Sequence, residues 1–541
     1  MKLYLIIISA LLSICLVACE TDDNVLRPDI PEKPIVVVFE SDVHAAVDGY
    51  ARLAGIREQQ KLLTPYVVTV SCGDFAQGDV VASVSSGENI VEIMNQVKYD
   101  VLTLGNHEFD FGITQMFKLT QALDASVVCA NFYDLRIGKH PFPAYQIVRY
   151  GEVDIAYIGF TTSTTMTNVS PKTFQDDNGN FIYDFTQGAF YQRAQACIDD
   201  ARSEGADYVV ALAHLGDEDK GDHASSVSLI KHTTGIDVVL DGHDHHMIAD
   251  TLIADLDGTP VLLASTGTKF ANVGLLTLST EGTFSSRLVP ANSVEAPVSS
   301  HIQNFVDEIK DKALADGKRV VGVSEVTMSV NDEFGQRMVR NQECAIGNFC
   351  ADAFRVVLNT DVAMMNGGGI RSEIRQGDVT YNDLLSVFPY NNSACVSTIT
   401  GRQLLDVLEF SVSFLPNEDG SFMHVSGLKF EVDASVPPQV VLDEHNLFSH
   451  IGEGERRVSN LLVWDKEEQA YKPVDLERSY TLASINYLLR DMGGSGVFRY
   501  AEPKEDNLGQ DVEILTSFIN QELDGRIGKQ YANTEGRIVI R

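Results

Sequence analysis

A short polar segment of the sequence combines side chains that could bind a metal ion and move a proton. Residues 105–110 read Gly-Asn-His-Glu-Phe-Asp and follow an apolar run at 99–104 that has the composition of a buried strand. In an open α/β sheet, ligands bind at the carboxyl ends of the strands. Asn106 could therefore ligate a metal while His107, steadied by Asp110, faces a substrate. Alone, such a segment is more typical of a polar turn that caps a helix.

Four further apolar segments end in the same way, which favours a metal centre over a turn. The candidate ligands are Asp42 and His44 after residues 35–39, Asp74 after 66–70, His214 after 208–213, and His243 and His245 after 237–240. A lone histidine is more often a satisfied core group than a ligand, but this ordered set is hard to obtain by chance. Nitrogen and oxygen donors suit Zn, Mn, Fe, Co or Ca rather than a thiolate metal site.

Composition restricts the class of protein. The chain has 541 residues, 44% of them hydrophobic and 22% charged, which is typical of a globular protein too long for one core. We therefore expect two domains. The net charge of −35 argues against a nucleic-acid polymer or an anionic membrane surface as partner, so an anionic substrate must meet locally placed cations.

The first residues have the pattern of an export signal. Lys2 precedes an apolar stretch at 3–17 that is short for a membrane span, and the stretch ends Leu-Val-Ala-Cys at Cys19. This ending resembles the bacterial lipoprotein box. We predict a signal peptide at 1–18, a lipidated Cys19 and a tether at 19–33; the alternative is a plain secretory signal cut after Ala18. The protein is then an exported lipoprotein on the periplasmic or cell-surface face of a bacterial membrane, held there by its lipid anchor only.

The ordered motifs resemble a known family. They are Asp42-x-His44, Gly73-Asp74-x-x-Gln77-Gly78, residues 105–110, His214 and Gly242-His243-x-His245. Together they are similar to the motif series of the calcineurin-like metallophosphatases, and more closely to that of the 5'-nucleotidases that also hydrolyse UDP-sugars. Many of those nucleotidases have Gln or Asn where this chain has His245, whereas the wider superfamily commonly has His.

The resemblance implies a centre of two divalent ions, with Zn, Mn, Co, Fe and Mg as candidates. Asp42, His44, His245 and a bridging Asp74 would hold one ion, and Asp74, Asn106, His214 and His243 would hold the other. Such ions activate water for attack on phosphorus. His107 and Asp110 match the catalytic pair of the family, with a helix-capping pair as the alternative. Glu108 and His246 receive no role and are expected behind the ligands or on the surface.

The C-terminal part carries a second set of family-like residues for the substrate. Arg340 and the run 366–371, Asn-Gly-Gly-Gly-Ile-Arg, resemble the C-terminal signature of the nucleotidases. The implied substrate-binding residues are Arg340, Asn366, Gly368, Arg371, Tyr390, Tyr487 and Ser495. The two tyrosines stand where the family places rings that stack on the base, although core packing is an equal alternative. Ser495 stands where the family usually has an aspartate that binds the ribose hydroxyls.

These observations predict an α/β protein. We expect a metallophosphatase β-sandwich flanked by helices at 34–295, a linker helix at 296–319 and a smaller α/β substrate-binding domain at 320–541. The expected reaction is hydrolysis of nucleoside 5'-monophosphates, with UDP-sugars as further candidate substrates. A 2',3'-cyclic nucleotide phosphodiesterase or another phosphoester or diphosphate hydrolase is the alternative enzyme. A surface binding protein with a vestigial site is disfavoured because no ligand position is missing. The preferred base and the oligomeric state stay open.

Overall fold

The computed structural model describes residues 29–541 except 177, 186–188, 219–222 and 444. The signal peptide at 1–18, Cys19 and most of the tether therefore lie outside the described residues. In the part of the chain that is described, no helix is both long and apolar enough to cross a lipid bilayer.

The N-terminal lobe is built on two six-stranded sheets that pack face to face. Their strand orders are β14-β13-β1-β2-β3-β4 and β11-β12-β10-β9-β7-β6. Apolar side chains from both sheets share one core, among them Val37 and Phe39 of β1, Val210 of β9 and Leu240 of β10. This arrangement confirms the predicted sandwich, because each strand buries one face against the other sheet and the other face against helices.

Five strands of these sheets end at the predicted ligand loops. They are β1 (Ile35–Glu40), β2 (Val67–Ser71), β3 (Val101–Leu102), β9 (Tyr208–His214) and β10 (Val238–Asp241). β1, β2 and β3 run parallel in one sheet, as do β9 and β10 in the other. β3 is shorter than the strand predicted at 99–104, since only two of its residues pair with the neighbouring strands.

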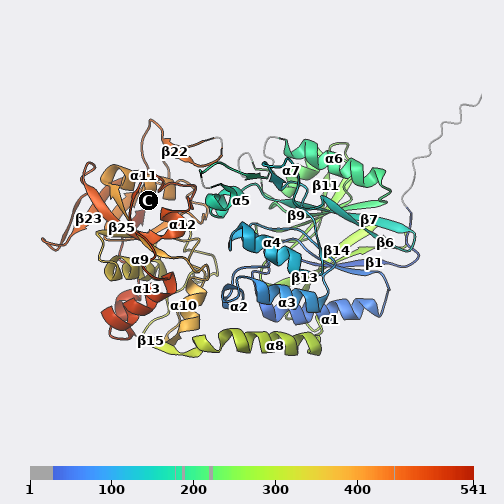
Figure 1. The fold of residues 1–541 in the computed structure, drawn as a ribbon, viewed down its shortest axis with the longest axis horizontal. Helices are drawn as coiled ribbons and strands as arrows, with labels where there is room; N and C mark the ends of the chain where they lie inside the picture. Colours follow the sequence, from blue (N-terminus) through green and yellow to red (C-terminus); the bar gives the residue numbers. More distant parts are fainter. Residues whose placement is uncertain (1–28, 177, 186–188, 219–222, 444) are drawn as a thin grey trace, which may run out of the picture.

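Helices cover the outer faces of both sheets (Figure 1). α1 (Tyr50–Lys61), α3 (Glu88–Val97) and α4 (Ile113–Ala122) pack on the first sheet, and α6 (Phe190–Ser203) and α7 (Ser226–His232) pack on the second. α8 (Ser300–Leu314) is the helix expected near the linker, and it packs against the first lobe through Ile302, Val306 and Ile309. From there the chain enters the second lobe at β15 (Val320–Ser324).

The C-terminal lobe has its own core around a five-stranded sheet of order β19-β16-β25-β18-β26. Its central strands are β16 (Val362–Asn366), β25 (Ser479–Ile485) and β18 (Ala394–Thr400), and its main helices are α9 (Ala345–Val357), α10 (Tyr381–Val387), α11 (Gly401–Ser411) and α13 (Asp511–Ser517). Thr380 and Thr400 cap α10 and α11 through capping boxes, as the sequence predicted.

The two lobes lie side by side, and α8 runs along the N-terminal lobe, below α1 and α3 in this view, to β15 of the other lobe (Figure 1). Hydrogen bonds between them include those from the Ser83 hydroxyl to the Pro389 carbonyl at 2.5 Å, from the Tyr487 hydroxyl to the Asn168 carbonyl at 3.2 Å, and from the Ser170 hydroxyl to the Asp491 carbonyl at 2.8 Å. Pro389, which precedes Tyr390, and Tyr487 thus both contact the N-terminal lobe.

Candidate functional site

The ligand loops have a strained backbone. Asp42, His44, Asp74, His243 and His245 all have positive φ angles, between 45° and 89°, although none is a glycine. This conformation costs of order 1 to 3 kcal/mol for a residue with a Cβ, and it persists where the surrounding structure imposes it. The loops after β1 and β2 hold each other in this conformation. The Asp42 amide donates to the Gly73 carbonyl and the His44 amide donates to the Asp74 carbonyl.

All seven predicted metal ligands meet at this edge of the sandwich. His44 Nε2 lies 3.0 Å from His245 Nε2 and 3.9 Å from Asp74 Oδ2. His214 Nε2 lies 3.1 Å from Asp74 Oδ2, and His245 Nε2 lies 3.6 Å from Asp42 Oδ1. His243 Nδ1 lies 3.0 Å from Asn106 Oδ1. Asp74 stands between the two halves of the cluster, next to His44 on one side and His214 on the other.

The donor atoms of this cluster fit divalent cations. His214 Nδ1 contacts the Cys72 carbonyl at 2.8 Å and His44 Nδ1 contacts the Gln77 carbonyl at 3.3 Å, which leaves both Nε2 atoms free to ligate. His214 Nε2 is buried and makes no hydrogen bond among the described residues. Burial lowers the pKa of His214, but the Asp74 and Asp42 carboxylates outweigh it and raise the pKa to about 10. The buried carboxylates of Asp42 and Asp74 therefore favour positive charge at this position.

His107 and Asp110 form a close pair beside the ligands. His107 Nδ1 lies 2.5 Å from Asp110 Oδ2, and the His107 backbone amide donates to Asp74 Oδ1 at 2.8 Å. Burial lowers the pKa of His107, but Asp110 and Asp74 raise it by more, so the net shift is upward. A protonated imidazole with one nitrogen held by Asp110 can donate a proton from the other to a leaving oxygen.

Glu108 is a positioning residue that the sequence did not single out. Its buried carboxylate accepts from the amides of Asp74 at 2.9 Å, Phe75 at 2.8 Å, Ala76 at 3.0 Å and Gly105 at 2.6 Å. It ties the loop after β2 to the loop after β3 and so orients Asp74. In the sequence, only its place in the 105–110 motif indicated that Glu108 lies near the metal-binding loops. His246 lies outside the cluster as expected, 2.7 Å from Asp217.

Two arginines of the C-terminal lobe reach towards this cluster. Arg340 and Arg371 are half-buried, and the guanidinium group of neither makes a hydrogen bond or ion pair among the described residues. Burial, with the nearby charges of Arg337 and Arg371, lowers the pKa of Arg340 to about 9. The charge of Arg371 also acts on His107 and Asp110. The Tyr390 ring lies 6.4 Å from the His107 ring, so the second lobe lies next to the predicted catalytic pair.

The other predicted substrate residues have partners inside the protein. The Asn366 side-chain amide and the Gly368 backbone amide both donate to the Gly420 carbonyl, at 3.1 and 2.9 Å, so the Gly368 N–H is already used within the protein. The Asn366 Oδ1 atom is buried without a hydrogen bond among the described residues. The Tyr487 ring packs directly on Gly493. A Cβ atom at Gly493 would lie only 2.4 Å from the ring, so this close packing requires glycine.

Ser495 adopts φ 52°, and its carbonyl accepts from the Phe448 amide at 2.7 Å. The nearby carboxylate of Asp491 accepts from the Asn486 side chain at 2.6 Å and lies 3.8 Å from Lys172. Asp491 is thus already engaged, which argues against its taking the part of the missing aspartate. The binding roles of these residues stay predictions.

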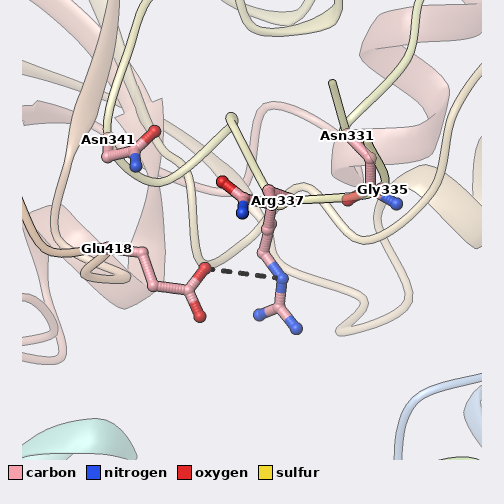
Figure 2. Close-up of a pocket in the computed structure, with 6 residues that line it drawn as sticks. Asn331, Gly335, Arg337, Asn341 and Glu418 are labelled. Atoms are coloured by element: carbon pink, nitrogen blue, oxygen red, sulfur yellow. Dashed lines mark ion pairs between the residues drawn. The ribbon is translucent and has the colours of Figure 1, made fainter. Parts of the chain in front are cut away.

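A pocket beside Arg337 was not indicated by any motif. Asn331, Gly335, Gln336, Arg337, Asn341 and Glu418 line a cavity of about 460 Å³. Arg337 Nε lies 3.7 Å from Glu418 Oε2, and this ion pair stands at the cavity (Figure 2).

Comparison with known proteins relates both lobes to described families. Residues 35–247 match the family "Calcineurin-like phosphoesterase" and residues 320–501 match "5'-nucleotidase, C-terminal domain". A 5'-nucleotidase of Vibrio cholerae is 25% identical over 88% of this chain and 86% of its own length. A trifunctional nucleotide phosphoesterase of Bacillus subtilis is 25% identical over 95% of this chain, which spans only 36% of that longer protein.

A solved structure has the same fold. The 5'-nucleotidase precursor of Thermus thermophilus superimposes with a TM-score of 0.77 over 94% of this chain and 99% of its own, at 23% identity. The two-lobe arrangement of Figure 1 is therefore shared with that protein.

Proposed function

Because the chain belongs to the calcineurin-like phosphoesterases that carry a 5'-nucleotidase C-terminal domain, we propose that it hydrolyses nucleoside 5'-monophosphates to nucleoside and phosphate. The observation that carries this proposal is the convergence of Asp42, His44, Asp74, Asn106, His214, His243 and His245 beside the His107–Asp110 pair. UDP-sugars are further candidate substrates.

The N-terminal lobe supplies the chemistry. The seven ligands would hold two divalent ions, with Asp74 between them, and such ions lower the pKa of water and neutralise phosphoryl oxygens. Asp110 holds His107 Nδ1, so the other ring nitrogen faces the leaving oxygen and gives it a proton. Glu108 fixes Asp74 through the backbone amides of both ligand loops.

The C-terminal lobe binds the rest of the substrate. Within the described part of the chain, the guanidinium groups of Arg340 and Arg371 have no acceptor, which suits a phosphate ester in a protein of net charge −35. Tyr390, next to His107, and Tyr487 would stack on the base. The same proposal places the protein outside the cytoplasm, anchored by a lipid on Cys19.

Phosphate release from AMP tests the proposal. Protein treated with a chelator should be inactive and should regain activity with Mn, Zn, Co or Mg. Asp74→Asn should abolish turnover, because this carboxylate is the one placed between both halves of the ligand cluster. Asp307→Asn, on the exposed face of α8, is the matched control and should keep full activity. Full activity after chelation, or an Asp74→Asn variant within a few-fold of wild type, would refute the dimetal mechanism.

A further inference from the structure

The threonine that ends β7 (Val153–Thr161) contacts two segments that carry predicted metal ligands. Thr161 is buried, and its hydroxyl donates to the Leu104 carbonyl at 2.6 Å. Thr161 also pairs with His214 in the parallel ladder between β7 and β9, and the Thr162 amide donates to the His214 carbonyl at 2.8 Å. One residue of the second sheet thus contacts a ligand-bearing segment of the first sheet and a ligand of its own sheet.

The peptide group between Leu104 and Gly105 is held at both of its polar atoms. Its carbonyl oxygen accepts from the Thr161 hydroxyl, and its N–H donates to Glu108 Oε2 at 2.6 Å. Two hydrogen bonds at opposite sides fix the plane of this peptide group. The next residue along the chain is Asn106, a predicted ligand, so the direction in which the chain enters Asn106 depends on Thr161 as well as on Glu108.

The side chain of Asn131 takes the place of a neighbouring strand at the end of β7. The Thr161 amide donates to Asn131 Oδ1 at 2.9 Å, and Asn131 Nδ2 donates to the Thr161 carbonyl at 2.7 Å. A side-chain amide has one acceptor and one donor group, so this pairing uses both polar backbone atoms of Thr161. Asn131 is buried and follows β4 (Ser126–Val127), a strand of the first sheet. It therefore fastens the end of β7 to the other sheet.

The backbones of the two sheets meet at this point because residue 159 is a glycine. The Ala130 amide donates to the Gly159 carbonyl at 2.8 Å. A Cβ atom at Gly159 would lie 2.0 Å from the carbonyl oxygen of Val128, which is too close for any other residue. The short distance between the backbones is what allows the Asn131 side chain to reach Thr161.

The Thr161 hydroxyl has a second neighbour, the Cys129 thiol. Cys129 Sγ lies 3.4 Å from Thr161 Oγ1. The hydroxyl has one proton, and the Leu104 carbonyl at 2.6 Å can only accept. The thiol therefore donates to the hydroxyl, and the hydroxyl donates to Leu104.

We propose that Thr161 and Asn131 are positioning residues for the ion that Asn106 and His214 would hold. The inference rests on the dimetal centre of the proposed function and adds two residues that belong to none of the motifs noted in the sequence. The affinity of a metal site depends on partners behind the ligands that hold them at the right separation. Because Thr161 contacts the segments of two ligands of the same ion, its loss should weaken that ion more than the ion assigned to the loop after β1.

Zn²⁺ binding to the metal-free protein tests the proposal. Thr161→Val removes the hydroxyl and keeps the branched shape of the side chain. Competition with a chromophoric chelator should show two ions bound to the wild type, and in Thr161→Val one of the two should bind about tenfold more weakly. Asn131→Ala should have the same effect, because the end of β7 loses its attachment to the first sheet. Thr161→Ser keeps the hydroxyl and should bind both ions as the wild type does.

Thr233→Val is the matched control. The Thr233 hydroxyl is also buried and donates to a backbone carbonyl, that of Leu229, at 2.7 Å. It lies in the same lobe but before the start of β10, whereas the predicted ligands follow the end of that strand. Thr233→Val should lower the midpoint of denaturant unfolding of the metal-free protein about as much as Thr161→Val does, and it should leave both zinc affinities unchanged.

Several outcomes would overturn the inference. Equal zinc affinities in the wild type and Thr161→Val would mean that the hydroxyl only joins the sheets. Similar losses at both ions, or a loss in Thr233→Val, would mean that the variants weaken the lobe as a whole. A Thr161→Ser variant as weak as Thr161→Val would show that the hydroxyl is not the group responsible. These results would leave the proposed function standing, whereas a wild-type protein that binds neither Zn²⁺ nor Mn²⁺ would refute the dimetal centre itself.

Discussion

Replacement of Glu108 by glutamine tests whether this carboxylate assembles the metal-binding loops. Oε2 accepts from the amides of Asp74 and Gly105, and Oε1 accepts from those of Phe75 and Ala76. Glutamine has nearly the same shape, but one of the two oxygens becomes an NH₂ group. Whichever way the new side chain turns, two backbone donors lose their acceptor and face another donor.

The structure gives the size of the effect. A hydrogen bond to a charged group contributes about 1.5 to 3 kcal/mol, so the loss of two amounts to about 3 to 6 kcal/mol. Burial and the nearby Asp74 charge raise the pKa of Glu108, because they make the ionised side chain less stable in the folded protein. We therefore expect Glu108→Gln to lower the free energy of unfolding by an amount at the lower end of this range of about 3 to 6 kcal/mol, about 3 kcal/mol. Because Asp74 is displaced, metal affinity should fall roughly tenfold to a hundredfold.

Two measurements check this prediction. Denaturant unfolding should be followed by circular dichroism, since Trp464, the only tryptophan, lies in the C-terminal lobe. Competition with a chelator gives the metal affinity. Glu88→Gln is the matched control, because Glu88 forms an exposed pair with Lys118 and should change stability by less than about 0.5 kcal/mol. If Glu108→Gln unfolds within about 1 kcal/mol of wild type and binds metal equally well, the carboxylate does not assemble the site.

Four further predictions follow from the sequence and the structure. Arg371→Ala should lower kcat/KM for AMP at least about tenfold, mainly through KM, and should hardly affect p-nitrophenyl phosphate, which is too small to need the C-terminal lobe. The ratio of kcat/KM for AMP to that for dAMP should be small in the wild type and should rise in Ser495→Asp, because a carboxylate accepts from both ribose hydroxyls. Burial, together with the charges of Asp42 and Glu108, raises the pKa of Glu40 from 4.5 to about 8. The free energy of unfolding is therefore highest below pH 4.5, where Glu40 is neutral in both states, and it falls as the pH rises from 4.5 to about 8. Denaturation at several pH values should therefore show a weaker pH dependence in Glu40→Gln. Cys19→Ala should move the protein from the membrane fraction to the soluble fraction.

Each of these predictions has an outcome that contradicts it. Equal losses on AMP and p-nitrophenyl phosphate would mean that Arg371 supports the fold. A large AMP preference in the wild type would place Ser495 away from the ribose. A pH profile that Glu40→Gln does not change would show that Glu40 ionises normally, and a Cys19→Ala protein that stays in membranes would refute the lipid anchor.

The convergence of the predicted metal ligands could be expected from the sequence because each one ends an apolar strand or lies in the loop that follows it. A strand of five or six apolar residues fixes where the next polar side chain emerges, and parallel strands bring these ends to one edge. The order of Asp42, His44, Asp74, Asn106, His214, His243 and His245 was therefore enough to place them together, and the structure does so. The helix caps at Thr380 and Thr400 were equally local and were predicted for the same reason.

The tertiary structure alone decided which residues surround those ligands. Glu108 accepts from amides more than 30 positions away, and nothing in its own motif distinguishes that role from a surface position. Gly368 is a substrate-binding residue by resemblance, but its amide donates to the carbonyl of Gly420, more than 50 positions away. Tyr390 and His107 come from different lobes, and their rings lie 6.4 Å apart only because the lobes pack against each other. Sequence spacing fixes the side chains at the end of one strand, whereas contacts between distant segments depend on how the lobes and loops pack.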